Sequence, residues 1–196
     1  MCTIPVFYAT THGQTRRIAE AIADVLRKDG HASVALDVTS EAGRHFDWRR
    51  ASGAVLTASL HAGRHQSSAA NLAREHVAHL NGMPSWFVSV SLSAASTHAE
   101  ERAAAERLAR AFVEGVGWTP SRVSCVAGRL AYTEYSFFTR WFMRRIARKE
   151  GGPTDTSRDH ELTDWNGLAL LSRQFGREVW EGVEVRDAGQ IAPCRS

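Results

Sequence analysis

The chain has 196 residues, of which 43% are hydrophobic and 23% charged, with a formal net charge of +3 at pH 7. This length suits one α/β domain with a full core and is too short for two typical enzyme domains. We expect neither a signal peptide nor a membrane span, and the three widely spaced cysteines exclude a disulfide framework and favour a reducing cytoplasm.

The first predicted element is a buried strand at residues 3–9, and the loop after it is the most informative segment of the chain. A helix is predicted to follow at residues 15–28. A strand that ends in a hydroxyl-rich loop before a helix directs backbone N–H groups, hydroxyls and the helix dipole at one point, which suits a phosphate. Composition alone leaves open a polar turn that caps the helix. The loop consists of Thr10, Thr11, His12, Gly13, Gln14 and Thr15.

The elements that follow alternate between short apolar runs and longer amphipathic segments. Strands are predicted at residues 32–36, 53–59, 86–91 and 122–127, and helices at 67–80, at 98–115 and from 163 onward. This alternation predicts an α/β fold with a doubly wound, five-stranded parallel sheet in the order 2-1-3-4-5. We expect one domain over residues 1–182 and a loose tail over 183–196.

The loop at residues 10–15 resembles the pattern T-x-T-G-x-T with which flavodoxin-like domains bind the phosphate of FMN. In that fold the flavin ring lies over the loops after the third and fourth strands, which flank the first strand. Both loops are small and polar, and His61 or His65 is a candidate to cover part of the ring, although a solvated loop position explains either. The ring-binding candidates are Ser59, Leu60, His61, Ala62, Gly63, Ser91, Leu92 and Ser93.

Residues 128–162 form an insert between the fifth strand and the last helix that a plain flavodoxin connection does not require. Aromatic residues alternate there with five basic residues, and on a helix Arg140, Arg144 and Arg148 would form one stripe, close to Trp141. An amphipathic helix docked on the sheet explains this pattern. So does a segment that rests on anionic lipid, or a surface for a flat apolar substrate that carries carboxylates. One short cluster makes nucleic-acid binding the weakest interpretation.

Several motifs in order make the resemblance more specific. They are the loop at 10–15, Asn-Gly-Met-Pro-Ser at 81–85, the insert, Gly-Gly-Pro-Thr-Asp-Thr at 151–156 and Thr-Asp-Trp at 163–165. Together they resemble the flavodoxin-type, menaquinone-dependent protoporphyrinogen IX oxidases of bacterial haem biosynthesis, over roughly residues 3 to 180. The segments at 63–66 and 132–135 depart from the family's usual composition.

The resemblance implies FMN as cofactor, protoporphyrinogen IX as substrate and menaquinone or another quinone as electron acceptor. It implies a cytoplasmic enzyme that touches the inner face of the membrane through residues 132–150, with Arg140, Trp141, Arg144 and Arg148 as substrate or membrane contacts. We expect no metal and no nucleic acid, and no side chain stands out as an acid or base. A general FMN-dependent quinone reductase and a flavodoxin-type electron carrier are the alternatives.

Overall fold

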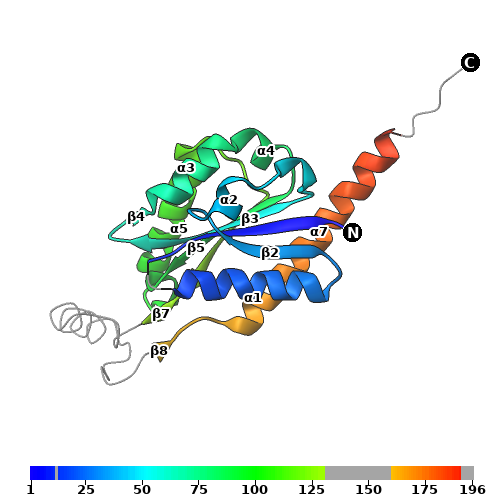
Figure 1. Ribbon diagram of the computed structural model, residues 1–196. Coiled ribbons are helices and arrows are strands. Elements are labelled where there is room, and N and C mark those ends of the chain that lie inside the picture. The colour runs from blue at the N-terminus through cyan, green and yellow to red at the C-terminus, as the bar shows by residue number, and fades with distance from the viewer. Residues whose placement is uncertain (12, 131–159, 191–196) are drawn as a thin grey trace, which may run out of the picture.

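The computed structural model describes residues 1–11, 13–130 and 160–190. Its main sheet has five parallel strands in the order β2-β1-β3-β5-β6, which confirms the predicted order 2-1-3-4-5 (Figure 1). These strands are β1 (Thr3–Ala9), β2 (Ala32–Asp37), β3 (Ala54–His61), β5 (Ser85–Ser91) and β6 (Arg122–Ala127). A short sixth strand, β4 (Arg64–His65), pairs antiparallel with the end of β3 and was not predicted.

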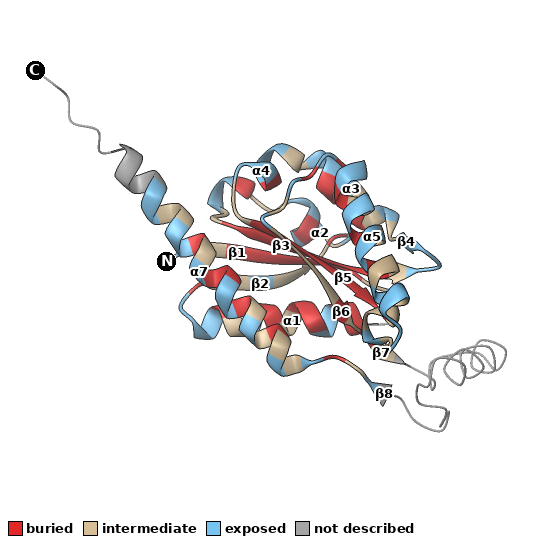
Figure 2. Ribbon diagram, turned by 180° about the vertical axis from the view of Figure 1, so that it is seen from behind, coloured by how far each residue is buried: buried red, intermediate tan, exposed pale blue. Residues whose placement is uncertain are grey.

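Helices cover both faces of this sheet. One face packs against α1 (Gln14–Lys28) and α7 (Trp165–Gln190). The other packs against α3 (Ser67–Glu75), α4 (Val77–Asn81) and α5 (Ala99–Gly115). The short helices α2 (Glu41–Arg44), η1 (Trp48–Arg50) and η2 (Ser93–Ala95) complete the connections. Figure 2 shows buried residues along the strands and on the helix faces turned toward them.

The core has two halves because side chains alternate along each strand. In β1, Ile4 and Val6 belong to the half under α1 and α7, whereas Phe7 and Ala9 belong to the half under α3 and α5. A strand buried on both faces needs apolar residues at almost every position. This is why β1, β3 and β5 were recognisable as continuous apolar runs.

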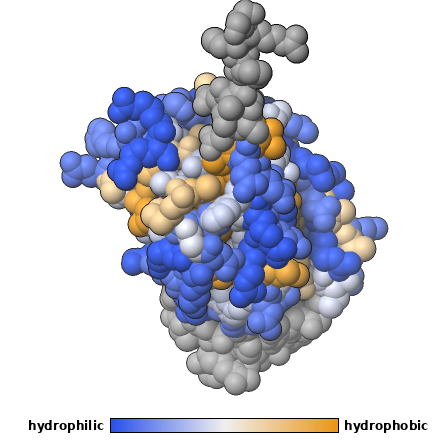
Figure 3. All heavy atoms as spheres, turned by 90° about the vertical axis from the view of Figure 1, so that its right-hand side faces the viewer, coloured by the Kyte–Doolittle hydropathy of each residue, from blue (hydrophilic) through white to orange (hydrophobic). Residues whose placement is uncertain are grey.

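Two helices differ from their predicted bounds. The segment predicted as one helix at 67–80 is divided into α3 and α4 at His76, whose φ of −114° and ψ of 21° depart from helical values. The last helix continues to Gln190, so residues 183–190, expected as a loose tail, are helical. Its final turns extend past the end of the sheet (Figure 1). That end of the molecule is mostly hydrophilic, with a few apolar side chains among the polar ones (Figure 3).

The two ends of the insert meet in a small antiparallel pair, β7 (Arg129–Leu130) and β8 (His160–Glu161). Residues 131–159 lie outside the described residues, and with them the helix expected there and its predicted contacts Arg140, Trp141, Arg144 and Arg148. Among the helices that the structure describes, none is long and apolar enough to cross a membrane.

Candidate functional site

The loops after β1, β3 and β5 meet at one edge of the sheet. Because these three strands are neighbours and parallel, their carboxyl ends lie side by side. Every predicted cofactor residue belongs to one of these loops, or to the strand end or helix start beside it. In doubly wound sheets this edge is where ligands bind.

The loop after β1 has the features of an anion site. Gly13 adopts a left-handed φ of 78°, and a Cβ placed there would meet no atom within 4 Å. Its N–H donates to Thr10 Oγ1 at 3.0 Å. Helix α1 has no side-chain cap and no acidic residue in its first turn, so the N–H groups at its start are suited to an external anion. His12 lies outside the described residues.

Gln66 joins this loop to the end of β3. Its Nε2 donates to Thr11 Oγ1 at 3.0 Å and to Ser59 Oγ at 2.6 Å, and its Oε1 accepts from the Ser59 N–H at 3.2 Å. The amide therefore holds two predicted site residues together. Sequence reasoning missed Gln66, because its position just before α3 signals only a helix start.

The predicted loop at residues 59–63 is mostly a hairpin. Leu60 and His61 extend β3 and pair with β4, which leaves Ala62 and Gly63 as a two-residue turn. Both turn residues have positive φ, 47° and 76°, as a type I′ hairpin turn requires, and both are exposed. Ala62 is the one non-glycine residue with positive φ among those described. The strained turn stands at the edge where the flavin ring is expected.

The His65 side chain is directed toward β5 and α5 rather than outward with this turn. Its Nε2 lies 2.9 Å from Ser89 Oγ, and its ring packs against Phe87 and Phe112 with centroid distances of 5.2 and 4.9 Å. Burial lowers the pKa of His65 to about 4, so the ring is neutral at pH 7. Of the two histidines considered as covers for the flavin ring, His65 is half-buried against Phe87 and Phe112, and His61 is exposed on the hairpin.

The third loop begins at the end of β5. Ser91 is buried, and its Oγ accepts from the Ala94 N–H at 3.2 Å, which starts the short helix η2. Leu92 and Ser93 are half-buried beside it. The Ser91 carbonyl accepts from the Gly128 N–H at 3.2 Å, so this loop is tied to the start of the insert.

Gln14 and Thr15 are both buried at the start of α1. The Gln14 side chain donates to Glu161 and Thr163, on the segment that returns from the insert. Its backbone N–H, rather than its amide, is therefore the group suited to a phosphate. Sequence reasoning missed Glu161 and Thr163, since nothing local in the sequence predicts a contact with residue 14.

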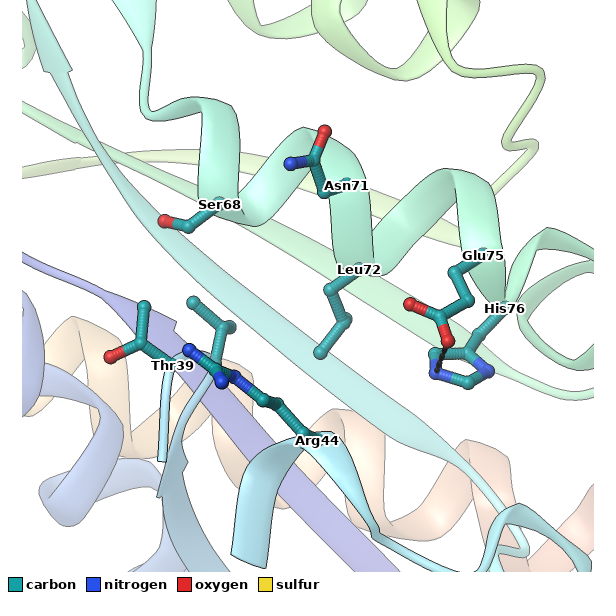
Figure 4. A pocket seen from close by; sticks show the side chains of 8 residues that line it. Thr39, Arg44, Ser68, Asn71, Leu72, Glu75 and His76 are labelled. Atoms are coloured by element: carbon teal, nitrogen blue, oxygen red, sulfur yellow. Dashed lines mark ion pairs between the residues drawn. The ribbon is translucent and has the colours of Figure 1, made fainter. Parts of the chain in front are cut away.

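A separate pocket opens between α2 and α3 (Figure 4). The Glu75 carboxylate lies 4.0 Å from His76 Nε2 at one end of it, and burial lowers the pKa of His76. The lining residues are Val38, Thr39, Arg44, Ser68, Asn71, Leu72, Glu75 and His76. None of them is a predicted cofactor residue. Within the described part of the chain, no group of His, Cys, Asp or Glu is arranged to hold a metal ion.

Comparison with known proteins links these features to particular relatives. A flavodoxin domain model matches residues 5–157. The protoporphyrinogen IX dehydrogenase [quinone] of Escherichia coli K12 is 32% identical over 171 residues, which cover 87% of this chain and 92% of that protein. The protein of the same name from Leishmania major is 30% identical, with coverage of 87% and 73%.

Solved structures give the same fold. Oxidised flavodoxin 1 from Bacillus cereus superposes with a TM-score of 0.52 at 13% identity, covering 89% of this chain and 97% of that one. At this identity the likeness establishes the fold alone. It confirms the flavodoxin-like arrangement predicted from the order of strands and helices.

Proposed function

The chain belongs to the family of flavodoxin-type, quinone-dependent protoporphyrinogen IX dehydrogenases, and we propose that it oxidises protoporphyrinogen IX to protoporphyrin IX with FMN as cofactor and a quinone as acceptor. The observation that carries this proposal is the 32% identity over 87% of the chain. The loop geometry supports it independently, because the uncapped start of α1 and the left-handed Gly13 before it would suit a phosphate.

The residues of the three loops fit FMN. The N-terminal turn of α1 and the hydroxyls of Thr10 and Thr11 would hold the phosphate, with Gly13 leaving room for close approach of the backbone. The exposed turn at Ala62 and Gly63 and the loop at residues 91–93 would flank the ring. These roles rest on the position of the loops at one sheet edge.

When bound, FMN supplies the two-electron redox chemistry, and the protein supplies binding, orientation and electrostatics. Conversion of the porphyrinogen to the porphyrin removes six electrons, so the substrate must be oxidised in three such steps. At the edge of the ring, the chain would contribute the backbone N–H and C=O groups of the hairpin turn at Ala62 and Gly63. His65 is neutral and engaged with Ser89, and we assign no side chain as an acid or base.

We further propose that the acceptor is menaquinone and that residues 132–150 contact the inner face of the membrane. The support is the sequence pattern of that segment, in which Arg140, Arg144 and Arg148 are spaced so that on a helix they would form one stripe near Trp141. Arginines match both carboxylates and lipid phosphates, and an aromatic residue beside them suits a membrane interface. The same stripe would meet the propionates of the substrate.

An anaerobic assay tests the proposed activity. Protein reconstituted with FMN receives protoporphyrinogen IX, and protoporphyrin fluorescence is followed with and without a menaquinone analogue. We expect formation of porphyrin that depends on both the protein and the quinone. Flavin binding without porphyrin formation would refute the proposal and favour a general quinone reductase or an electron carrier.

A triple substitution tests the role of the insert. Arg140→Ala, Arg144→Ala and Arg148→Ala together should reduce porphyrin formation and sedimentation with anionic vesicles, while FMN affinity stays unchanged. The matched control replaces the exposed Arg50, Arg107 and Arg110, which removes the same charge from other elements. Equal effects of the two triple variants would show that net charge, rather than the insert, is responsible.

A further inference from the structure

The residues at the two ends of the insert, 127–128 and 161–163, form its base, and hydrogen bonds fix this base to the main sheet. The Gly128 N–H donates to the Ser91 carbonyl at 3.2 Å where the insert begins. Where it ends, the Leu162 N–H donates to the Gly128 carbonyl at 3.2 Å and Thr163 Oγ1 donates to the Ala127 carbonyl at 2.7 Å. Residues 161–163 are therefore held against the end of β6.

This returning segment binds the first residue of α1. Gln14 Nε2 donates to Glu161 Oε1 at 2.9 Å and to Thr163 Oγ1 at 3.0 Å. Gln14 Oε1 accepts from Arg17 Nη1 at 3.2 Å, and Arg17 Nη1 also lies 3.3 Å from Glu161 Oε2. The guanidinium of Arg17 in turn stands 5.6 Å from the ring centre of Trp165. Gln14 is 7% exposed, and both the nitrogen and the oxygen of its side-chain amide have partners.

The position of Gln14 gives these contacts a consequence for the cofactor. It is the first helical residue after Gly13, so its backbone N–H belongs to the turn that would bind the phosphate. Its side chain and its N–H share one Cα, so holding the buried side chain in place limits how far the N–H can move. The partners that fix it come from residues 161–163, about 150 positions later in the chain.

We propose that Glu161 and Thr163 are positioning residues for the FMN phosphate, acting through Gln14. Docking of the insert base and binding of the phosphate are then thermodynamically linked, and each strengthens the other by the same factor. This inference rests on the FMN site of the proposed function. It adds that the phosphate site is complete only when the far end of the insert is seated on α1.

A purely electrostatic role for Glu161 leads to the opposite expectation. A carboxylate near a phosphate dianion repels it, so removing the carboxylate would strengthen binding of FMN. Positioning predicts weaker binding of FMN after the same change. The sign of the effect therefore separates the two roles.

The decisive experiment measures the affinity of the full-length apoprotein for FMN and for riboflavin, which lacks the phosphate, by flavin fluorescence. We expect Glu161→Ala to weaken FMN binding about tenfold, the value of the hydrogen bond from Gln14 to this charged group, and to leave riboflavin binding unchanged. Glu161→Gln keeps an oxygen acceptor for Gln14 and should recover most of the FMN affinity. Glu181→Ala, an exposed acidic position on α7, is the control and should change neither affinity.

Hydrogen exchange tests the linkage in the reverse direction, as the effect of bound FMN on the base of the insert. FMN should slow exchange of the Leu162 and Thr163 amides in the wild-type protein, whereas riboflavin should not. The inference is overturned if Glu161→Ala leaves FMN affinity unchanged or raises it, or if it weakens FMN and riboflavin equally. Those outcomes leave the proposed function intact, because that proposal is tested by whether the wild-type protein binds FMN and forms porphyrin.

Discussion

The half-buried ring of His65 makes a measurable contribution to how stability depends on pH. Its Nε2 is 2.9 Å from Ser89 Oγ, and Phe87 and Phe112 pack against the ring. Burial disfavours the charged imidazolium and lowers the pKa of His65 from 6.5 to about 4. The folded protein therefore binds a proton at this ring more weakly than the unfolded chain does.

The sign of the effect follows from proton linkage. Between pH 6.5 and pH 4 the unfolded chain binds more protons at this position, so the free energy of unfolding rises with pH across that window. The contribution is fully present above pH 6.5 and is lost as the pH falls through about 4. At roughly 1.4 kcal/mol per pKa unit, its upper limit is about 3 kcal/mol, of which about 2 kcal/mol is lost between pH 7 and pH 5.

The assay compares urea unfolding of the wild-type protein and the His65→Gln variant at several pH values from 7 to 5. Burial also lowers the pKa of His31 and His76, so the wild-type curve alone mixes three rings, and the difference between the two proteins isolates one. We expect the stability advantage of the wild type to shrink by about 2 kcal/mol at pH 5. A difference that stays constant with pH would refute this account of the His65 environment, as would an NMR titration of the ring near its ordinary pKa.

Two backbone substitutions test the geometry of the loops near the sheet edge. Gly43→Ala would place a Cβ 2.0 Å from the Asp37 carbonyl oxygen, so we expect a loss of about 2 kcal/mol in the free energy of unfolding, and unchanged stability would contradict this packing. Ala62→Gly removes the steric strain of a left-handed alanine at φ 47°. Glycine also gives the unfolded chain more conformational freedom, so we expect a net rise of only about 0.5 kcal/mol in the free energy of unfolding. A lower melting temperature for this second variant would show that the turn is not strained at Ala62.

The strands and their order could be predicted because burial on both faces leaves a strong local pattern. Continuous apolar runs as short as β3 and β5 are typical of strands in the middle of a parallel sheet. The pattern failed for β4, because two residues are too few to show any period. The pattern also failed at the C-terminus, where residues 183–190 are helical. Once the earlier turns of α7 have formed, each further residue joins the helix at a low free-energy cost, even where its hydrophobic pattern is weak.

The sequence predicts only part of the candidate site. Thr10 and Gly13 lie in one contiguous loop, so they were assigned together to a phosphate site, and that assignment stays a prediction. Gln66 and Glu161 bind that loop from positions far along the chain, and such contacts depend on how the strands and the insert are folded back. The direction of His65 was likewise decided by the antiparallel pairing of β4 with β3, which turns its ring toward Ser89.

The two attachments of the insert lie beside each other and reach two of the loops at the expected cofactor position. Its start is held by Ser91, in the loop that would flank the ring, and its return is held by Gln14, at the start of the helix that we propose binds the phosphate. A displacement of the insert base would therefore reach both the ring loop and the phosphate loop. Residues 127–128 and 161–163 form one hydrogen-bonded unit between the two loops. If both proposals hold, the segment that would bring substrate or membrane to the flavin is docked on the same residues that would hold the cofactor.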